Sequence, residues 1–197
     1  MYSKLPNLVI GFHGCDRLSV EKVLYKNEKM HESVNDYDWL GHGVYFWEQN
    51  YDRALDWAAS QLKIKTPAVI GAVIDLGRCL NLFDKHYIDV VKKQYETLKD
   101  RYEFIRKELP RNKNVGNNTD LLLRNLDCTV IESLHEDLKI TREPEYDSVR
   151  GMFFEGKEIY PGSGFRSNTH VQICVRNPNC IKGLFLPKAS VEEWSIP

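Results

Sequence analysis

The nine residues AVIGAVIDL, Ala68 to Leu76, constrain the fold more than any other stretch. Pro67 precedes them and Gly77 follows them. A short run rich in valine and isoleucine between turn-forming residues predicts a strand, and apolar residues throughout indicate that both faces of this strand are buried. We therefore expect a β-sheet in which this segment is one of the buried strands.

Shorter segments carry the same kind of signal. In the last clear one, valine and isoleucine side chains alternate with His170, Gln172 and Cys174. Successive side chains of a strand point to opposite faces, so one face suits a core and the other suits a polar cleft. The predicted strands are residues 8–13, 43–46, 149–154 and 169–175, and 181–186 is a further candidate.

Helices are predicted between these strands. Ser19 is a plausible N-cap for a helix that ends near Lys26, and residues 52–59 contain good helix formers. Residues 86–109 repeat apolar side chains every three or four positions, which predicts a long amphipathic helix. This helix either packs on its own domain or forms a dimer contact or a lid. A further helix is predicted from Thr119 or Asp120 to Leu138, and three histidines are expected at the surface: His31, His86 and His135.

Composition narrows the class of protein. The chain has 197 residues, of which 42% are hydrophobic and 28% charged, which fits a single domain, residues 1–197, with a helical insertion at about 84–140. The formal net charge of −1 gives no overall basic field for nucleic acid or membranes. Five widely spaced cysteines without a CxxC pair are expected to be reduced thiols, and no motif for a metal site occurs. No apolar stretch resembles a signal peptide or a membrane span, so a cytoplasmic protein is expected.

The stretch GHGVYFWEQNYDRALDWA, which begins at Gly41, is the most informative for function. A glycine turn leads into a strand that carries Tyr45, and the following helix carries Trp57. Glycines let the backbone approach a ligand closely, and aromatic rings beside the turn can form a flat slot. His13 and Gln172 are the polar residues that two other strands are expected to offer to a site containing Tyr45.

Phe12-His13-Gly14, then the glycine turn with Tyr45, then a late polar strand position, resembles the poly(ADP-ribose) polymerase-like branch of the ADP-ribosyltransferases. The resemblance implies an α+β fold with a split β-sheet that clamps NAD⁺ and needs no metal. It implies that His13 binds the adenosine ribose and that the Gly14 backbone pairs with the nicotinamide carboxamide. Tyr45 would stack on the nicotinamide ring, and Trp57 is the candidate for its other face.

The third position of the family pattern departs from it. Where the family usually has glutamate, this chain has Gln172. A glutamine can still hydrogen-bond the nicotinamide ribose but is a poor general base. Glu155, in the loop before this strand, is a candidate for the missing carboxylate, and so is Glu48. Within the family, loss of that glutamate accompanies transfer of single ADP-ribose units.

These residues predict a mono-ADP-ribosyltransferase, with the character of a toxin or defence effector, that uses NAD as co-substrate and releases nicotinamide. The acceptor, protein or nucleic acid, and the oligomeric state stay open. Two alternatives are a non-catalytic NAD or ADP-ribose reader and an RNA 2′-phosphotransferase of the same fold. The second would need an arginine-rich phosphate site, for which the chain offers Arg53, Arg150, Arg166 and Arg176. The loop of residues 155–168 is expected to face the acceptor.

Overall fold

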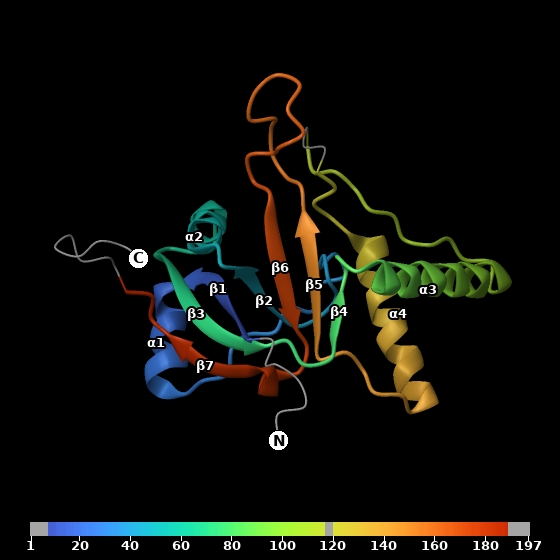
Figure 1. The fold of residues 1–197 in the computed structure, drawn as a ribbon, viewed down its shortest axis with the longest axis horizontal. Coiled ribbons are helices and arrows are strands. Elements are labelled where there is room, and N and C mark those ends of the chain that lie inside the picture. The colour runs from blue at the N-terminus through green and yellow to red at the C-terminus, as the bar shows by residue number, and fades with distance from the viewer. Residues whose placement is uncertain (1–7, 117–119, 189–197) are drawn as a thin grey trace.

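A computed structural model describes residues 8–116 and 120–188. In this part of the chain, seven strands form one mixed sheet in the order β4-β5-β6-β2-β1-β3-β7 (Figure 1). Only β4 and β5 run parallel among these pairs, and every other pair is antiparallel. The strands are β1 (Leu8–Asp16), β2 (Val44–Glu48), β3 (Pro67–Asp75), β4 (Cys79–Asn81), β5 (Ser148–Phe153), β6 (His170–Val175) and β7 (Ile181–Phe185).

Four α-helices and a short 3-10 helix accompany the sheet in the described residues. Both long helices, α3 and α4, lie between β4 and β5 in the chain and pack together beyond the β4 edge (Figure 1). The helices are α1 (Arg17–Lys26), α2 (Tyr51–Ser60), α3 (Lys85–Phe104), α4 (Asn125–Thr141) and η1 (Pro178–Cys180). The protein is therefore α+β, as expected.

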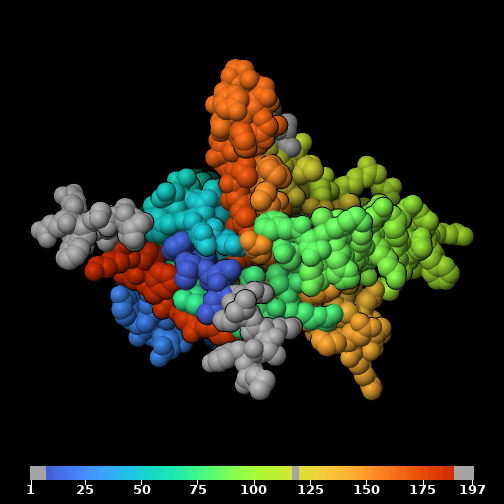
Figure 2. All heavy atoms as spheres, in the orientation of Figure 1, coloured from blue at the N-terminus to red at the C-terminus, as the bar shows by residue number. Residues whose placement is uncertain are grey.

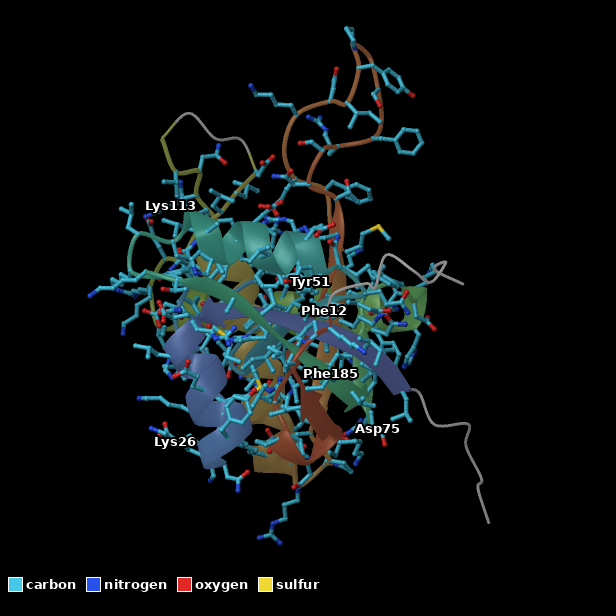
Figure 3. The ribbon with its side chains drawn as sticks, turned by 90° about the vertical axis from the view of Figure 1, so that its left-hand side faces the viewer. Phe12, Lys26, Tyr51, Asp75, Lys113 and Phe185 are labelled. Carbon is cyan, nitrogen blue, oxygen red and sulfur yellow. The ribbon has the colours of Figure 1, made fainter. Side chains whose placement is uncertain are left out.

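The two faces of the sheet have different covers. On one face α2 packs over β1, β2 and β3, and α4 packs over β5 and β6; its core includes Ala54, Ile131 and Leu134. On the other face, Val20 of α1 packs with Ile70. The predicted buried strand, residues 68–76, is β3, which lies between β1 and β7. Figure 3 shows Phe12 of β1 between Tyr51 of α2 and Phe185 of β7, whose ring centroids lie 5.8 and 6.5 Å away.

Several element boundaries differ from the prediction for local reasons. β1 runs to Asp16 and passes directly into α1, so Asp16, and not Ser19, caps the helix by accepting a hydrogen bond from the Leu18 amide at 3.0 Å. Thr119 lies outside the described residues, and α4 begins only at Asn125, downstream of Asp120.

The long amphipathic helix is real but shorter than predicted. α3 ends at Phe104, and Arg106 just beyond it has φ of 54°, which breaks the helix. Its buried positions include Gln94 and Leu98, whereas Ile88 of the predicted stripe is 48% exposed. The buried face is therefore rotated toward Gln94, whose amide donates to the Ser133 hydroxyl of α4 at 3.0 Å.

Gly14 sets how closely α2 approaches the sheet. A Cβ atom at this position would lie 2.1 Å from the backbone oxygen of Ala54. Because that oxygen belongs to the main chain of α2, a side-chain rotation cannot make room for it. The glycine is thus required for the contact between β1 and α2, whatever else it does.

We predict that Gly14→Ala lowers the free energy of unfolding by about 3 kcal/mol, because overpacking a tight core typically costs about 1–3 kcal/mol and here the helix itself must move. Urea denaturation of the purified variant measures this. Gly164→Ala is the matched control, because no heavy atom lies within 4 Å of its added Cβ. Equal stability of the two variants would contradict the close contact.

Candidate functional site

The pairing between β1 and β2 ends before it reaches Gly14. The two strands pair only at Gly11 with Glu48 and at Phe12 with Trp47. Continuing this register would place Gly14 opposite Tyr45, where a ladder hydrogen bond would use the Tyr45 carbonyl. That carbonyl instead lies 2.8 Å from Nδ1 of His13 and, because a carbonyl only accepts, the imidazole N–H donates to it.

As a result, the part of β1 beyond Phe12 has an edge that is not paired with β2. Residues of a strand direct their N–H and C=O groups to alternate sides. The Ile10 carbonyl accepts from the Gln49 amide on the β2 side, so Gly14, four residues on, directs its backbone groups to the same side. Gly14 therefore offers one donor and one acceptor just beyond the last paired residue. A primary carboxamide is complementary to such a pair.

Tyr45 is held rigidly beside this edge. Its hydroxyl donates to the Gly41 carbonyl at 2.6 Å and accepts from the Leu40 amide at 2.8 Å. Burial, the largest cause, raises the pKa of this phenol well above its usual value. The backbone of Leu40 and Gly41, at the start of the predicted glycine turn, thus positions the tyrosine through two hydrogen bonds to its hydroxyl.

The structure divides the predicted residues between the two faces of the sheet. Tyr45 pairs with Cys174, and Trp47 pairs with both Gln172 and Phe12, so these side chains share the face that α2 covers. His13, next to Phe12, lies on the opposite face, where its ring packs 5.9 Å from Phe46. His13 thus reaches Tyr45 through the backbone and not across a shared cleft.

Trp57 lies over the same face as Tyr45. It is 36% exposed, and its ring centroid is 5.5 Å from that of Trp47, which is buried. Gln172 is also buried, between Trp47 on β2 and Gly151 on β5. A series of tilted rings, Trp57, Trp47 and His170, therefore continues from α2 toward the start of β6.

Glu155 is the clearest departure from the expected surface loop. Its residue is only 6% exposed, and Oε2 lies 2.9 Å from Nη2 of Arg53 on α2 and 3.4 Å from Nδ1 of His170. The projecting loop between β5 and β6, at the top of Figure 1 and Figure 2, is thereby tied at its base to α2. Glu48, the other candidate carboxylate, is bound at both oxygens by Arg150.

His170 lies at the centre of this polar group. Its Nδ1 is 2.7 Å from the Asn168 carbonyl, which places the ring proton on Nδ1 and leaves Nε2 as an acceptor in the neutral ring. Burial is the main cause that lowers the pKa of His170; the Asn168 carbonyl and Glu155 oppose it, and Arg53 and Arg124 add to it. The imidazole is therefore neutral at neutral pH.

Arg124 closes the other side of the group. Its guanidinium carbon lies 4.2 Å from the ring centre of Trp39 and 4.8 Å from that of Phe153. Burial lowers the pKa of this guanidinium, and the contact with Asp127, 3.5 Å away, only partly opposes the effect. Arg124 is thus a partly desolvated cation that lies over two aromatic rings and pairs with Asp127.

Sequence reasoning gave His170 and Arg53 little weight and did not mark Arg124. The available signal for His170 was its place on the polar side of the same strand as Gln172. Arg53 and Arg124 carry no such signal, because Glu155 and Phe153 lie far from them in the chain.

Other parts of the molecule do not replace this site. A groove of about 950 Å³ lies between α3, α4 and the loop before β2, and His42 and Glu132 line it, but none of the predicted NAD residues does. Within residues 8–116 and 120–188, no group of three or more histidine, cysteine or acidic side chains is arranged to hold a metal ion. No helix there is long and apolar enough to cross a membrane.

Three buried histidines predict a pH dependence of stability. Burial lowers the pKa of His13, His135 and His170 in the folded state, so the unfolded chain binds more protons below its pKa of about 6.5. Their contribution to stability is full above that pH and is lost as the pH falls from it toward the folded-state pKa, by up to about 1.4 kcal/mol per pH unit for each group.

Urea denaturation at pH 7.5 and 5.5 measures this slope. We expect His135→Gln to have a shallower slope than the wild type and His86→Gln, which alters an exposed residue, to keep the wild-type slope. The same slope in all three proteins would show that His135 is not held neutral.

No family model matches the chain. An uncharacterized protein of Methanocaldococcus jannaschii is 26% identical to it over 199 residues, which covers 88% of this chain and 84% of that protein. The description of that relative names no activity.

Proposed function

We propose that this protein is an NAD-dependent mono-ADP-ribosyltransferase. The observation that carries the proposal is the hydrogen bond from His13 to the Tyr45 carbonyl, which ends the β1–β2 ladder before Gly14. Gly14 thereby presents a backbone donor and acceptor beside the fixed ring of Tyr45. The nicotinamide end of NAD⁺ needs both: a partner for its carboxamide and a π-face for its cationic ring.

Tyr45 supplies one aromatic wall, and Trp57 on α2 is positioned to supply a second. The Tyr45 ring needs no reorganisation, because two backbone hydrogen bonds already fix its hydroxyl. Trp57 keeps an exposed face, so it can contact a ligand without leaving the core. Gly14 would contribute main-chain groups only, which agrees with the absence of space for any side chain there.

The proposed reaction is substitution at the anomeric carbon of the nicotinamide ribose. The bond between that carbon and the ring nitrogen breaks, its electron pair returns to the nicotinamide, and an acceptor heteroatom forms the new bond and releases its proton. Gln172 would hydrogen-bond the ribose. Glu155 would supply negative charge near the developing oxocarbenium centre.

A second candidate is a reader that binds NAD or ADP-ribose without turnover. The ion pair of Glu155 with Arg53 favours it, because that carboxylate is already engaged by a guanidinium and is not free to activate an acceptor. The RNA 2′-phosphotransferase has less support, since Arg150 and Arg176 are each paired with a glutamate.

Label transfer from NAD⁺ labelled on its adenylate tests the proposal. The purified protein is incubated with whole-cell extract, with and without protease or nuclease, and released nicotinamide is measured in parallel. We expect label on a macromolecule, and about 5- to 30-fold less of it with Trp57→Ala, because loss of stacking and burial of one ring face costs on the order of 1–2 kcal/mol. Tyr45→Ala should abolish transfer.

Tyr25→Ala is the matched control, because it removes an exposed aromatic residue of α1, far from the site. Transfer that persists in Tyr45→Ala would refute the assignment of the nicotinamide slot. Saturable NAD⁺ binding without transfer or nicotinamide release would favour the reader. Absence of both binding and transfer would refute both functions.

A further inference from the structure

Unpartnered nitrogen atoms gather around Glu155. Among the described residues, six buried side-chain nitrogen or oxygen atoms have no hydrogen-bond partner, and all six are nitrogens. Four of them belong to this one group: Trp47 Nε1, Arg53 Nε, Arg124 Nε and His170 Nε2. Buried polar atoms normally find partners, so a concentration of exceptions in one place points to a missing ligand.

Ring and guanidinium contacts join these four residues. The Arg53 guanidinium lies 5.9 Å from the Trp47 ring centre, and the Trp47 and His170 ring centroids are 6.4 Å apart. Phe153 connects His170 to Arg124, at 5.7 Å from the imidazole and 4.8 Å from the guanidinium. The side chain of His170 is fully buried among them.

The chemistry of these atoms selects an anion. An indole nitrogen and the Nε of arginine can only donate hydrogen bonds. Arg53 pairs with Glu155 and Arg124 lies 3.5 Å from Asp127, yet the Nε of each guanidinium has no acceptor. Burial is the largest cause that lowers the pKa of Arg124, which indicates a cation short of solvent. The ion pair with Glu155 employs one terminal nitrogen of Arg53 and leaves its Nε unused.

We propose that Trp47, Arg53, Arg124 and His170 form a subsite for the diphosphate of the dinucleotide. The choice of ligand rests on the proposed function. Two arginines reach the group from separate elements, Arg53 from α2 and Arg124 from the residue before α4, and forked guanidinium groups match the oxygens of two phosphates. The subsite lies on the same sheet face as Tyr45 and Gln172, so one extended ligand can reach both.

Entry requires the segment of residues 120–124 to move, because the four nitrogens are enclosed. Several hydrogen bonds hold this segment. Among them, the Trp39 indole donates to the Leu122 carbonyl at 2.9 Å, the Gly156 amide donates to Asp120 at 3.0 Å, and Leu123 exchanges two backbone hydrogen bonds with Lys113. The bonds from Trp39 and Gly156 can be exchanged for contacts with a ligand or water. A bound phosphate would also give the Nε of Arg124 the acceptor that it lacks, which favours the exchange.

Isothermal titration calorimetry with inorganic pyrophosphate, ADP-ribose and nicotinamide riboside tests the subsite. We expect the first two to bind the wild type and to bind Arg124→Gln about 10- to 100-fold more weakly, the effect of losing a charge-assisted hydrogen bond. Trp47→Phe, which removes one donor and keeps an aromatic ring, should weaken both ligands less. Binding of nicotinamide riboside, which has no phosphate, should be the same in the wild type and Arg124→Gln.

Arg166→Gln is the matched control, because it removes an exposed arginine from the loop between β5 and β6 and should change affinity by about twofold or less. A bound anion at Nε2 would also favour the protonated form of His170, which otherwise faces Arg53, Arg124 and Glu155. Titrations in two buffers of different ionisation enthalpy should therefore detect proton uptake with pyrophosphate. A purely structural role for these residues would give none.

The outcomes separate this subsite from the transferase. No pyrophosphate binding, or equal losses in Arg124→Gln and Arg166→Gln, would overturn the subsite. Unchanged NAD turnover and KM in Arg124→Gln would overturn it as well, and the transferase would stand. Pyrophosphate binding with the expected pattern, but no nicotinamide release from NAD, would support the subsite and refute the transferase.

Discussion

The candidate site depends on the His13 side chain, which occupies a backbone carbonyl of β2 that β1 would otherwise use. β-Strands stay together because each backbone amide finds a carbonyl across the ladder. The Tyr45 carbonyl accepts from His13 instead, and the pairing of β1 with β2 ends after two residue pairs. The sheet remains continuous, yet it acquires an internal edge. Burial lowers the pKa of His13 and so keeps a neutral ring, which needs no counter-ion at this position.

Each side of that edge has its own support. On one side of the edge, α1 and α2 pack against opposite faces of β1 and β3. On the other side α4 packs against β5 and β6, and the Tyr45 ring rests on the same cluster. The group formed by Arg53, Glu155 and His170 crosses between the two sides, because Arg53 comes from α2 and the others from the ends of β5 and β6. A polar connection therefore joins two apolar cores.

Much of the framework could be predicted from local pattern. Residues 68–76 are apolar throughout, and residues 169–175 alternate apolar with polar side chains. Both patterns are typical of strands, and both segments form strands in the structure. β4 was not predicted, because three residues carry no periodicity and its partner, β5, lies about seventy positions away. Asp16 displaced Ser19 as a cap because β1 continues straight into α1.

Side-chain environments proved harder to predict than elements. Glu155 stands in a stretch rich in glycine, proline and serine, which indicates an exposed loop, and the loop does project from the body (Figure 2). Its burial is decided by Arg53, a partner 102 residues away that no local pattern reveals. His135 was expected at the surface and is 1% exposed, since its helix packs against Tyr146 through that side. Candidate residues on regular strands were therefore easier to find than those that meet through long-range ion pairs.

The contact between Gly14 and the Ala54 carbonyl has a consequence for how this protein can diversify. Most binding clefts change their dimensions when side chains are exchanged for larger or smaller ones. Here the gap between α2 and β1 is set by main-chain atoms on both sides, so side-chain substitution has little to vary there. Divergence in ligand choice would have to arise in the connecting segments, such as residues 120–124 and the β5–β6 loop, while the glycine and the helix that rests on it stay the same.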